Sequence, residues 1–387
     1  MRILYVSFDD IGSEYAWSVH VKEIVNGLAR RGHEVLVVAP GRTAPDDLEG
    51  SFVPMRVPGS RLARVFFHLV GSLWEILRAA RGFRPDAIYC RGIHLSITPP
   101  LAARFLGCAY VVEVNGLLEF ELGDSPMRPL VRFAHKETLS LANRAVAISE
   151  PIKRALVEEY GGRDDRVVVV QNGANVERFQ PRDQAEARAR LGLPGDARIV
   201  VYVGSFYRHH AVDLLVRSVP MLEKEHPNLL LLLLGAGSHR EELEREVRDA
   251  GIGRFVRFPG PKPHAEIPDW LAAANVCAYL LRDRGGQYDD GFSLKLLEYM
   301  AMARAVAVAS DKGEVCSFVN DNEIGYAEAL TGRGDVDRVS AMLSRLLADP
   351  DRRRDFGEAG RKLVVDHFNW DRAAGEVEEV LRSCVAG

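Results

Sequence analysis

One stretch of this 387-residue chain combines residue types that could bind a diphosphate and promote its departure. It reads Asp-Gly-Phe-Ser-Leu-Lys-Leu-Leu-Glu-Tyr-Met over 290–300, a glycine-containing loop that opens into a predicted helix over 294–302. The free backbone N–H groups of a first helical turn, at the positive end of the helix dipole, suit a diphosphate. A lysine in the same turn adds a full positive charge. The expected contacts to the diphosphate are Gly291, Phe292, Ser293, Leu294 and Lys295.

Two carboxylates flank this turn and suit sugar hydroxyls. Glu298 follows Lys295 by three residues and therefore lies on a neighbouring face of the helix, where it can accept hydrogen bonds from two vicinal ribose hydroxyls. Asp290, just before the turn, can accept from hydroxyls of a donor sugar. The spacing alone fits equally well an N-capped amphipathic helix that carries Lys295 and Glu298 as a surface pair.

Composition places the chain among ordinary globular proteins. Hydrophobic residues make up 47% and charged residues 27%, and the length suits two domains. A formal net charge of −4 gives no overall basic field for nucleic acid. The five scattered cysteines have neither zinc-ligand spacing nor the even number of a disulfide framework, so we expect neither metal nor disulfides.

The N-terminus reads as a buried strand over 3–8 and lacks the features of a signal peptide. The longest apolar runs, 229–234 and 276–281, are too short to span a bilayer. We therefore expect a cytoplasmic protein that at most touches the inner membrane from its face.

Short apolar runs alternate with helical periodicity and indicate parallel sheets. A strand over 3–8, a helix over 19–31 and a strand over 34–38 form a βαβ opening, and the pattern restarts with a strand over 198–203. This predicts two doubly wound α/β domains, 1–180 and 181–369. The terminal helix over 370–387 either packs back on the first domain or belongs to the second. Ligands of such domains bind outside the carboxyl ends of the strands.

Several stretches together resemble one family. Residues 290–298 resemble the Glu-x7-Glu motif of retaining GT-B glycosyltransferases of family 4, with Asp290 at the first carboxylate and Glu298 at the second. Further matches in order and spacing are the phosphate-gripping turn at 204–213, the linker turn at 171–179, and 145–150, 263–268 and 368–370.

The resemblance covers nearly the whole chain. It implies a GT-B fold of two Rossmann-like domains facing across a cleft, with the acceptor on the N-terminal domain and the donor on the C-terminal one. It also implies no metal and no cofactor beyond a nucleotide-sugar co-substrate, for which UDP is favoured by family frequency.

The chain departs from the family pattern at the phosphate turn. After Gly204, Ser205 stands where arginine is usual and His210 where lysine is usual. We expect Arg208 and Lys295 to act as the cationic pair instead, because their charges are permanent at neutral pH. Ser205 and His210 stay candidates for donor binding.

A second departure concerns the reacting sugar. Asn115 stands where the family often has histidine; it can hydrogen-bond a sugar hydroxyl but cannot act as a base. This suits a retaining mechanism in which the leaving phosphate oxygen takes the proton of the acceptor. The predicted catalytic residues are Asp290, Asn115, Lys295 and Arg208.

The acceptor side also differs from the family. In place of a Gly-Gly loop, the chain has Gly12, Ser13, Tyr15 and Trp17. The aromatic pair could stack on a sugar ring or an aromatic acceptor, although Trp17 could equally pack into the core. The basic and aromatic helix predicted over 61–78 could touch an anionic membrane that carries a lipid-linked acceptor, or could be an ordinary helix packed on the sheet.

Two other functions share the expected fold. A nucleotide-sugar 2-epimerase would need acid/base groups near the anomeric carbon, which Asn115 makes less favourable. A non-catalytic nucleotide-sugar-binding protein fits the altered phosphate turn. The Gly-x-Gly at 235–237 is weak evidence for a nicotinamide or flavin enzyme, because such a pair more often marks a tight turn.

Overall fold

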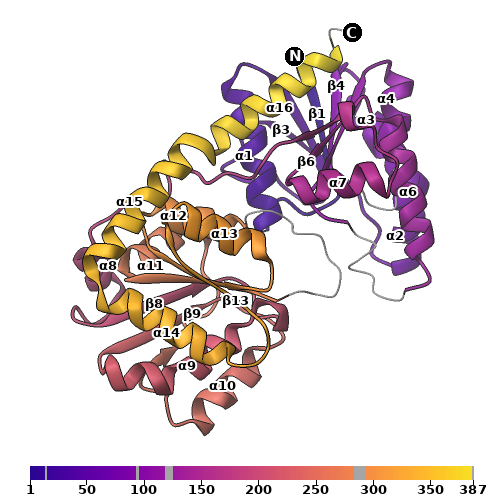
Figure 1. Cartoon of the computed structure of the whole chain (residues 1–387). Coiled ribbons are helices and arrows are strands. Elements are labelled where there is room, and N and C mark those ends of the chain that lie inside the picture. Colours follow the sequence, from indigo (N-terminus) through magenta and orange to yellow (C-terminus); the bar gives the residue numbers. More distant parts are fainter. Residues whose placement is uncertain (14, 93–95, 118–124, 283–292, 386–387) are drawn as a thin grey trace. The chain divides into compact units, whose positions relative to one another are not determined.

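The computed structural model describes residues 1–13, 15–92, 96–117, 125–282 and 293–385, with Arg61 and Leu62 described by their backbone alone. These residues form two compact units. The N-terminal unit holds 1–173 and 370–385, and the C-terminal unit holds 174–282 and 293–369. Each unit is built around one parallel sheet (Figure 1).

The sheet of the N-terminal unit has seven parallel strands in the order β3-β2-β1-β4-β5-β6-β7. The strands next to β1 are β2 and β4, so the order of strands reverses at β1 and creates a switch point between β1 and β4. Five of the six residues of β1 are buried, as in a parallel strand covered on both faces. The strands are β1 (Arg2–Ser7), β2 (Glu34–Ala39), β3 (Ser51–Pro54), β4 (Ala87–Arg91), β5 (Ala109–Val114), β6 (Arg144–Ala147) and β7 (Val167–Val169).

Helices cover this sheet, and one region differs from its prediction. The single helix predicted over 61–78 is α2 (Arg61–Phe66), a π-helical turn η1 (Phe67–Gly71) and α3 (Ser72–Ala80). A Cβ at Gly71 would lie 3.0 Å from the ring of buried Phe67, so glycine allows that ring to pack against the end of the turn. The remaining helices are α1 (Ala16–Arg30), α4 (Thr98–Leu106), α6 (Arg128–Leu141), α7 (Glu150–Glu158) and the short η2 (Asp164–Arg166).

The C-terminal helix α16 (Trp370–Val385) packs along α1 in the N-terminal unit (Figure 1). Gly27 permits the close approach, because a Cβ there would collide with the side chain of Ala374. Arg31 donates to the backbone oxygen of Asp371 at 2.9 Å, and Nε2 of His33 lies 3.1 Å from Glu378. A helix far away in sequence thus completes the first unit.

The C-terminal unit has six parallel strands in the order β10-β9-β8-β11-β12-β13, with its switch point between β8 and β11. All six leucines of β9 are buried. The strands are β8 (Arg198–Val203), β9 (Leu229–Leu234), β10 (Val256–Arg257), β11 (Val276–Leu281), β12 (Val306–Ser310) and β13 (Gly325–Ala329). The helices are α8 (Gln184–Leu191), η3 (Arg208–His210), α9 (Val212–Glu225), α10 (Arg240–Asp249), η4 (His264–Glu266), α11 (Ile267–Ala273), α12 (Leu294–Ala301), α13 (Gly313–Asp321), α14 (Asp335–Ala348) and α15 (Pro350–His367).

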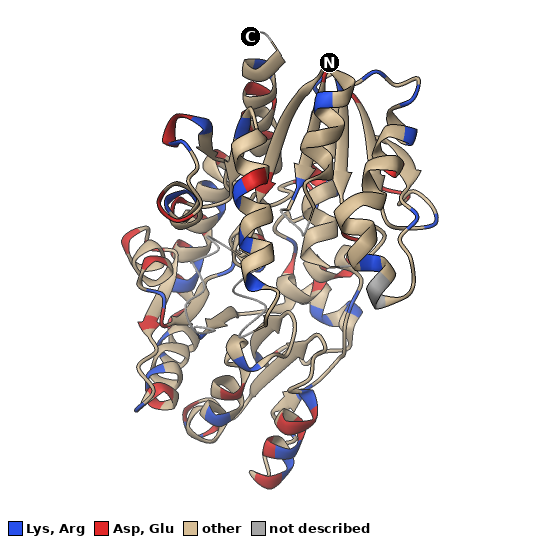
Figure 2. Cartoon of the chain, turned by 90° about the vertical axis from the view of Figure 1, so that its right-hand side faces the viewer, with Lys and Arg blue, Asp and Glu red and all other residues tan. Residues whose placement is uncertain are grey.

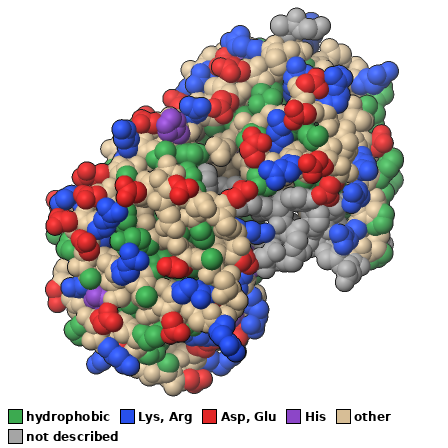
Figure 3. Space-filling view, in the orientation of Figure 1, with side chains coloured by type: hydrophobic (Ala, Val, Ile, Leu, Met, Phe, Trp, Pro, Cys, Tyr) green, Lys and Arg blue, Asp and Glu red, His purple; other side chains and the backbone are tan. Residues whose placement is uncertain are grey.

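The predicted class of two doubly wound α/β domains is confirmed by these two parallel sheets. The sequence did not predict β3, β13, α7, α8 or α13, and the two strands among these are edge strands with few buried side chains. In Figure 2 the strands are largely free of charge, and Lys and Arg alternate with Asp and Glu along the helices and loops. The face in Figure 3 likewise mixes side chains of both signs.

Candidate functional site

Lys295 lies against the carboxyl end of β8 in the C-terminal unit. Its Nζ donates to the hydroxyl of Tyr202 at 3.3 Å and lies 4.9 Å from the centre of that ring. Gly204, the first residue after β8, has a φ of 145°, and a Cβ there would collide with Lys295 Nζ. Gly204 is therefore required both by its backbone conformation and by the lysine that lies on it.

The ammonium group of Lys295 has no carboxylate within 4.0 Å in the described part of the chain. Burial lowers its pKa from 10.5 to about 8, and Glu298, which acts in the opposite direction, offsets only part of this effect. A desolvated, unpaired cation in the first turn of a helix is well placed to receive an anion.

Of the candidates in the phosphate turn, His210 contacts Ser205 of the same turn, whereas Arg208 pairs with a residue of another helix. His210 Nδ1 lies 2.6 Å from the backbone oxygen of Ser205, which only accepts, so Nδ1 carries the proton. In a neutral His210 the other nitrogen, Nε2, carries no proton, so it can donate to a phosphate only when the ring is protonated. Arg208 is three-quarters exposed and pairs with Glu242 of α10. No contact joins Arg208 to Lys295 among the described residues, and the role of Arg208 stays a prediction.

Glu298 is buried on α12 and is held by a residue from another element. His264 Nε2 lies 2.7 Å from Glu298 Oε1, and Arg178 Nη1 lies 3.0 Å from His264 Nδ1. Because a guanidinium only donates, Nδ1 of the neutral ring accepts and Nε2–H donates to the carboxylate. Arg178 thereby fixes the tautomer of His264, and His264 fixes Glu298.

The other donor candidates lie at the start of α12. Asp290, Gly291 and Phe292 lie outside the described residues. Ser293 has the extended backbone of an N-cap residue, with a φ of −61° and a ψ of 141°, but its side chain makes no capping hydrogen bond. Leu294 is the first residue of α12. The backbone amides of this turn are those predicted to hold the diphosphate.

The glycines at 235 and 237 serve packing. A Cβ on Gly235 would collide with the backbone oxygen of Gly204, and one on Gly237 with the backbone of Phe206. The amide of Gly204 donates to Leu234 at 2.9 Å. The two glycines thus allow this segment to pack closely against residues 204–206.

In the N-terminal unit, Asn115 lies just after β5 and Glu113 lies within it. Asn115 Nδ2 donates to Glu113 Oε1 at 2.6 Å, and His20 Nε2 lies 2.7 Å from the same oxygen. His20 is buried in α1, and its Nδ1 lies 3.0 Å from Asn172 Oδ1. The carboxyl end of β5 therefore carries a polar cluster centred on Glu113.

The loop after β1 holds the predicted acceptor-side residues. The amide of Gly12 donates to Asp10 Oδ1 at 2.9 Å, and the hydroxyl of Ser13 donates to the backbone oxygen of Asp10 at 3.0 Å. The rings of Tyr15 and Trp17 stack with centroids 4.3 Å apart and are 60% and 37% exposed. The alternative that Trp17 packs into the core is therefore wrong.

Comparison with known proteins places this geometry in a family. The model of glycosyl transferases group 1 matches residues 183–363, and that of glycosyltransferase family 4 matches 18–178. A GDP-mannose-dependent alpha-(1-6)-phosphatidylinositol monomannoside mannosyltransferase of Mycolicibacterium smegmatis is 30% identical over 290 residues, which are 74% of this chain and 73% of that protein. The chain belongs to the glycosyl transferases group 1 family.

Two further proteins are similar to this chain in sequence or in fold. A D-inositol 3-phosphate glycosyltransferase of Thermobispora bispora is 31% identical over 267 residues, 67% of this chain, and the match spans 60% of that protein. The solved structure of HepE from Anabaena with UDP-glucose has a TM-score of 0.77 at 16% identity, covering 99% of this chain and 100% of that one. The resemblance inferred from the motifs and the GT-B fold class are thus confirmed.

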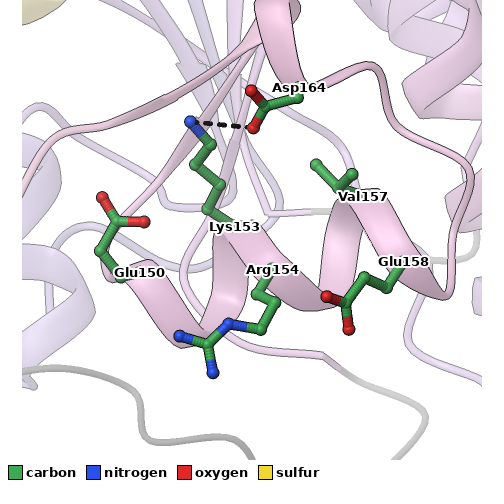
Figure 4. A pocket seen from close by; sticks show the side chains of 6 residues that line it. All are labelled: Glu150, Lys153, Arg154, Val157, Glu158 and Asp164. Carbon is green, nitrogen blue, oxygen red and sulfur yellow. Dashed lines mark ion pairs between the residues drawn. The ribbon is translucent and has the colours of Figure 1, made fainter.

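The surface hollow in Figure 4 includes none of the predicted site residues. It has a volume of about 260 Å³ and lies along α7, lined mainly by charged side chains. Lys153 pairs with Asp164 across it at 3.2 Å.

No three His, Cys, Asp or Glu side chains gather as a metal site within the described ranges. None of the helices in those ranges is long and apolar enough to cross a membrane.

Two residues that contact the predicted site residues were missed from the sequence. Glu113 is a single acidic residue in the otherwise apolar strand Ala-Tyr-Val-Val-Glu-Val, and that interruption is a usable signal. His264 was noted only as part of a matching stretch. Nothing in its local sequence indicates contact with Glu298, 34 positions away.

Proposed function

We propose that this protein is a retaining, metal-independent glycosyltransferase that moves a sugar from a UDP-sugar to a hydroxyl of a saccharide, lipid-linked or small-molecule acceptor. The observation that carries the proposal is the desolvated Lys295 beside the N-terminus of α12, which pairs with no carboxylate among the described residues, with Glu298 held one turn further on. Family membership supports sugar transfer, and the UDP-glucose bound to the structurally similar HepE supports a nucleotide-sugar donor.

In the proposed reaction, the bond between the anomeric carbon and the diphosphate oxygen breaks and a bond to the acceptor oxygen forms on the same face. The proton of the acceptor hydroxyl passes to the departing phosphate oxygen. Lys295 and the backbone amides at the start of α12 stabilise the negative charge on that oxygen. Glu298 holds the ribose, and Asp290 and Asn115 hold the donor sugar. No residue here acts as a base.

A thermal-shift screen tests the donor. UDP, GDP, ADP, dTDP and their sugars are compared on the wild type, on Glu298→Gln and on the exposed control Glu241→Gln, with and without EDTA. A ligand at about 100 times its Kd should stabilise the protein by about 2.7 kcal/mol. We expect UDP compounds to shift the wild type and the control but not Glu298→Gln. If GDP compounds alone raise the unfolding temperature, the donor carries guanine and not uracil. If EDTA removes the rise, metal independence is refuted.

Contact with a membrane is a further part of the proposal. Phe66, Val70 and Trp74 of the α2–η1–α3 segment are 65%, 53% and 62% exposed, more than a helix packed on its sheet requires. Arg64 lies on α2 and Arg81 directly follows α3, and both suit anionic head groups. Co-sedimentation with anionic vesicles, lost in Phe66→Ser/Trp74→Ser and at high salt, is the expected result. Equal sedimentation of the variant refutes this contact.

A further inference from the structure

The otherwise apolar strand β5 carries one buried acidic side chain, that of Glu113. Glu113 is 1% exposed, and its neighbours in the strand are apolar. Burial by itself raises the pKa of this carboxyl group, but His20, Arg91 and Tyr89 outweigh burial and bring the pKa to about 2. Glu113 is therefore a charged group in the interior. Keeping such a charge costs several kcal/mol unless each of its oxygens is well satisfied.

Partners from β4, from α1 and from the loop after β5 satisfy this carboxylate. Oε2 accepts a hydrogen bond from the hydroxyl of Tyr89 in β4, at 2.5 Å. Oε1 accepts from Asn115 Nδ2 at 2.6 Å and lies 2.7 Å from His20 Nε2 of α1. Arg91 lies further away, with Nε at 3.9 Å from Oε1, and pairs mainly with Asp9 at 2.8 Å.

The charge on Glu113 decides which way the amide of Asn115 faces. An ionised carboxylate only accepts hydrogen bonds, so the amide nitrogen must point to it and the amide oxygen must point away. Asn115 Oδ1 is buried and makes no hydrogen bond in the described part of the chain. An acceptor that is removed from water and has no donor is unfavourable. A ligand hydroxyl that donates to Oδ1 would satisfy it.

We propose that Glu113 is a positioning residue, which holds Asn115 with its amide oxygen free to accept a hydrogen bond from a substrate hydroxyl. This inference rests on the proposed function and adds the direction of one hydrogen bond to it. Asn115 Oδ1 accepts that hydrogen bond, and a hydroxyl group of the donor sugar or of the acceptor substrate donates it. A neutral residue at position 113 would lose this control. Glutamine, for example, could turn its own NH₂ to Asn115 Oδ1 and reverse the Asn115 amide.

A double-mutant cycle of Glu113→Gln and Asn115→Leu tests the inference. Turnover is followed as hydrolysis, in which water takes the sugar and UDP is released from UDP-glucose or GDP from GDP-mannose. Each single variant should lower kcat/KM by about 100-fold, because misplacing a substrate contact has effects of this size. If Glu113 acts through Asn115, Glu113→Gln should have little further effect in the Asn115→Leu background. Fully additive losses overturn the inference.

The matched control is Tyr89→Phe, which removes the other hydrogen bond of Glu113 and leaves Asn115 in place. It should lower the unfolding temperature while keeping kcat/KM within about 3-fold of wild type. A merely structural Glu113 would instead give equal losses of activity in Tyr89→Phe and Glu113→Gln. If Glu113→Gln does not fold, Glu113→Asp replaces it in the cycle, because its carboxylate keeps the charge but ends one methylene short of Asn115.

The same variants separate failure of this inference from failure of the proposed function. Nucleotide binding belongs to the C-terminal unit and should be equal in all of them. A wild type that neither binds nor turns over the two donors contradicts the proposed function. The unfolding free energies of the cycle require no turnover, and additive values there contradict the contact between Glu113 and Asn115.

Discussion

Replacing Lys295 by methionine should stabilise the protein and impair donor binding at the same time. Methionine has a similar length and no charge, so it removes the half-buried ammonium group without leaving a cavity. The wild-type lysine stays charged at pH 7 although burial lowers its pKa to about 8 from 10.5. The unfolded chain holds that proton more tightly, and this difference corresponds to about 3 kcal/mol of destabilisation.

Removing this destabilisation is a gain in stability for Lys295→Met, but the variant loses part of it again. Lys295→Met removes the hydrogen bond to Tyr202 and the contact of the ammonium group with the ring, together worth about 1–2 kcal/mol. A net gain of about 1–2 kcal/mol remains, which raises the Tm of a unit of this size by roughly 3–6 °C.

The pH dependence provides the specific test. Because the pKa of Lys295 is lower in the folded protein, its penalty is complete below about pH 8 and disappears as pH rises toward the unfolded value of 10.5. The advantage of Lys295→Met should therefore be largest at pH 7 and shrink between pH 8 and 10. The binding of UDP, which needs the charge, should weaken in the wild type over the same range.

The measurements are chemical unfolding and titration calorimetry with UDP at pH 7, 8, 9 and 10. Lys224→Met, at an exposed lysine of α9, is the control and should leave both stability and UDP affinity nearly unchanged. The reasoning is that burial of Lys295, and not pairing with a carboxylate, determines its pKa and its effect on stability. A destabilised Lys295→Met, or a stability difference that is independent of pH, would refute it.

Three further substitutions have defined outcomes. Gly204→Ala should weaken UDP binding at least about 10-fold, because its Cβ displaces the ammonium group of Lys295 and alanine is strained at a φ of 145°. Titration calorimetry measures the affinity for UDP, and an unchanged affinity contradicts this prediction. His264→Ala, which removes a hydrogen bond to a charged group, should lower UDP affinity about 10-fold with little change in Tm, and a loss of Tm alone would assign it a structural role. Gly27→Ala should cost about 1–3 kcal/mol of unfolding free energy by overpacking α1 against α16, whereas Gly195→Ala, with open space around it, should cost little.

The sequence by itself determined the fold class and the main elements. Apolar runs such as the six leucines of β9, and apolar faces such as that of α1, mark strands and helices because each pattern is local and has a fixed period. The helix that carries Lys295 and Glu298 was predictable for the same reason. The edge strands β3 and β13 were not, since an edge strand buries little and shows a weak pattern.

The tertiary structure alone decided how the site side chains are held. Glu113 meets Tyr89 because β4 and β5 pair with Arg91 opposite Glu113, and it meets His20 because α1 packs beside these strands. His20 in turn reaches Asn172, 152 positions away. Periodicity along the chain cannot specify such pairs, because each depends on strand register and on helix packing that are fixed only when the whole unit folds.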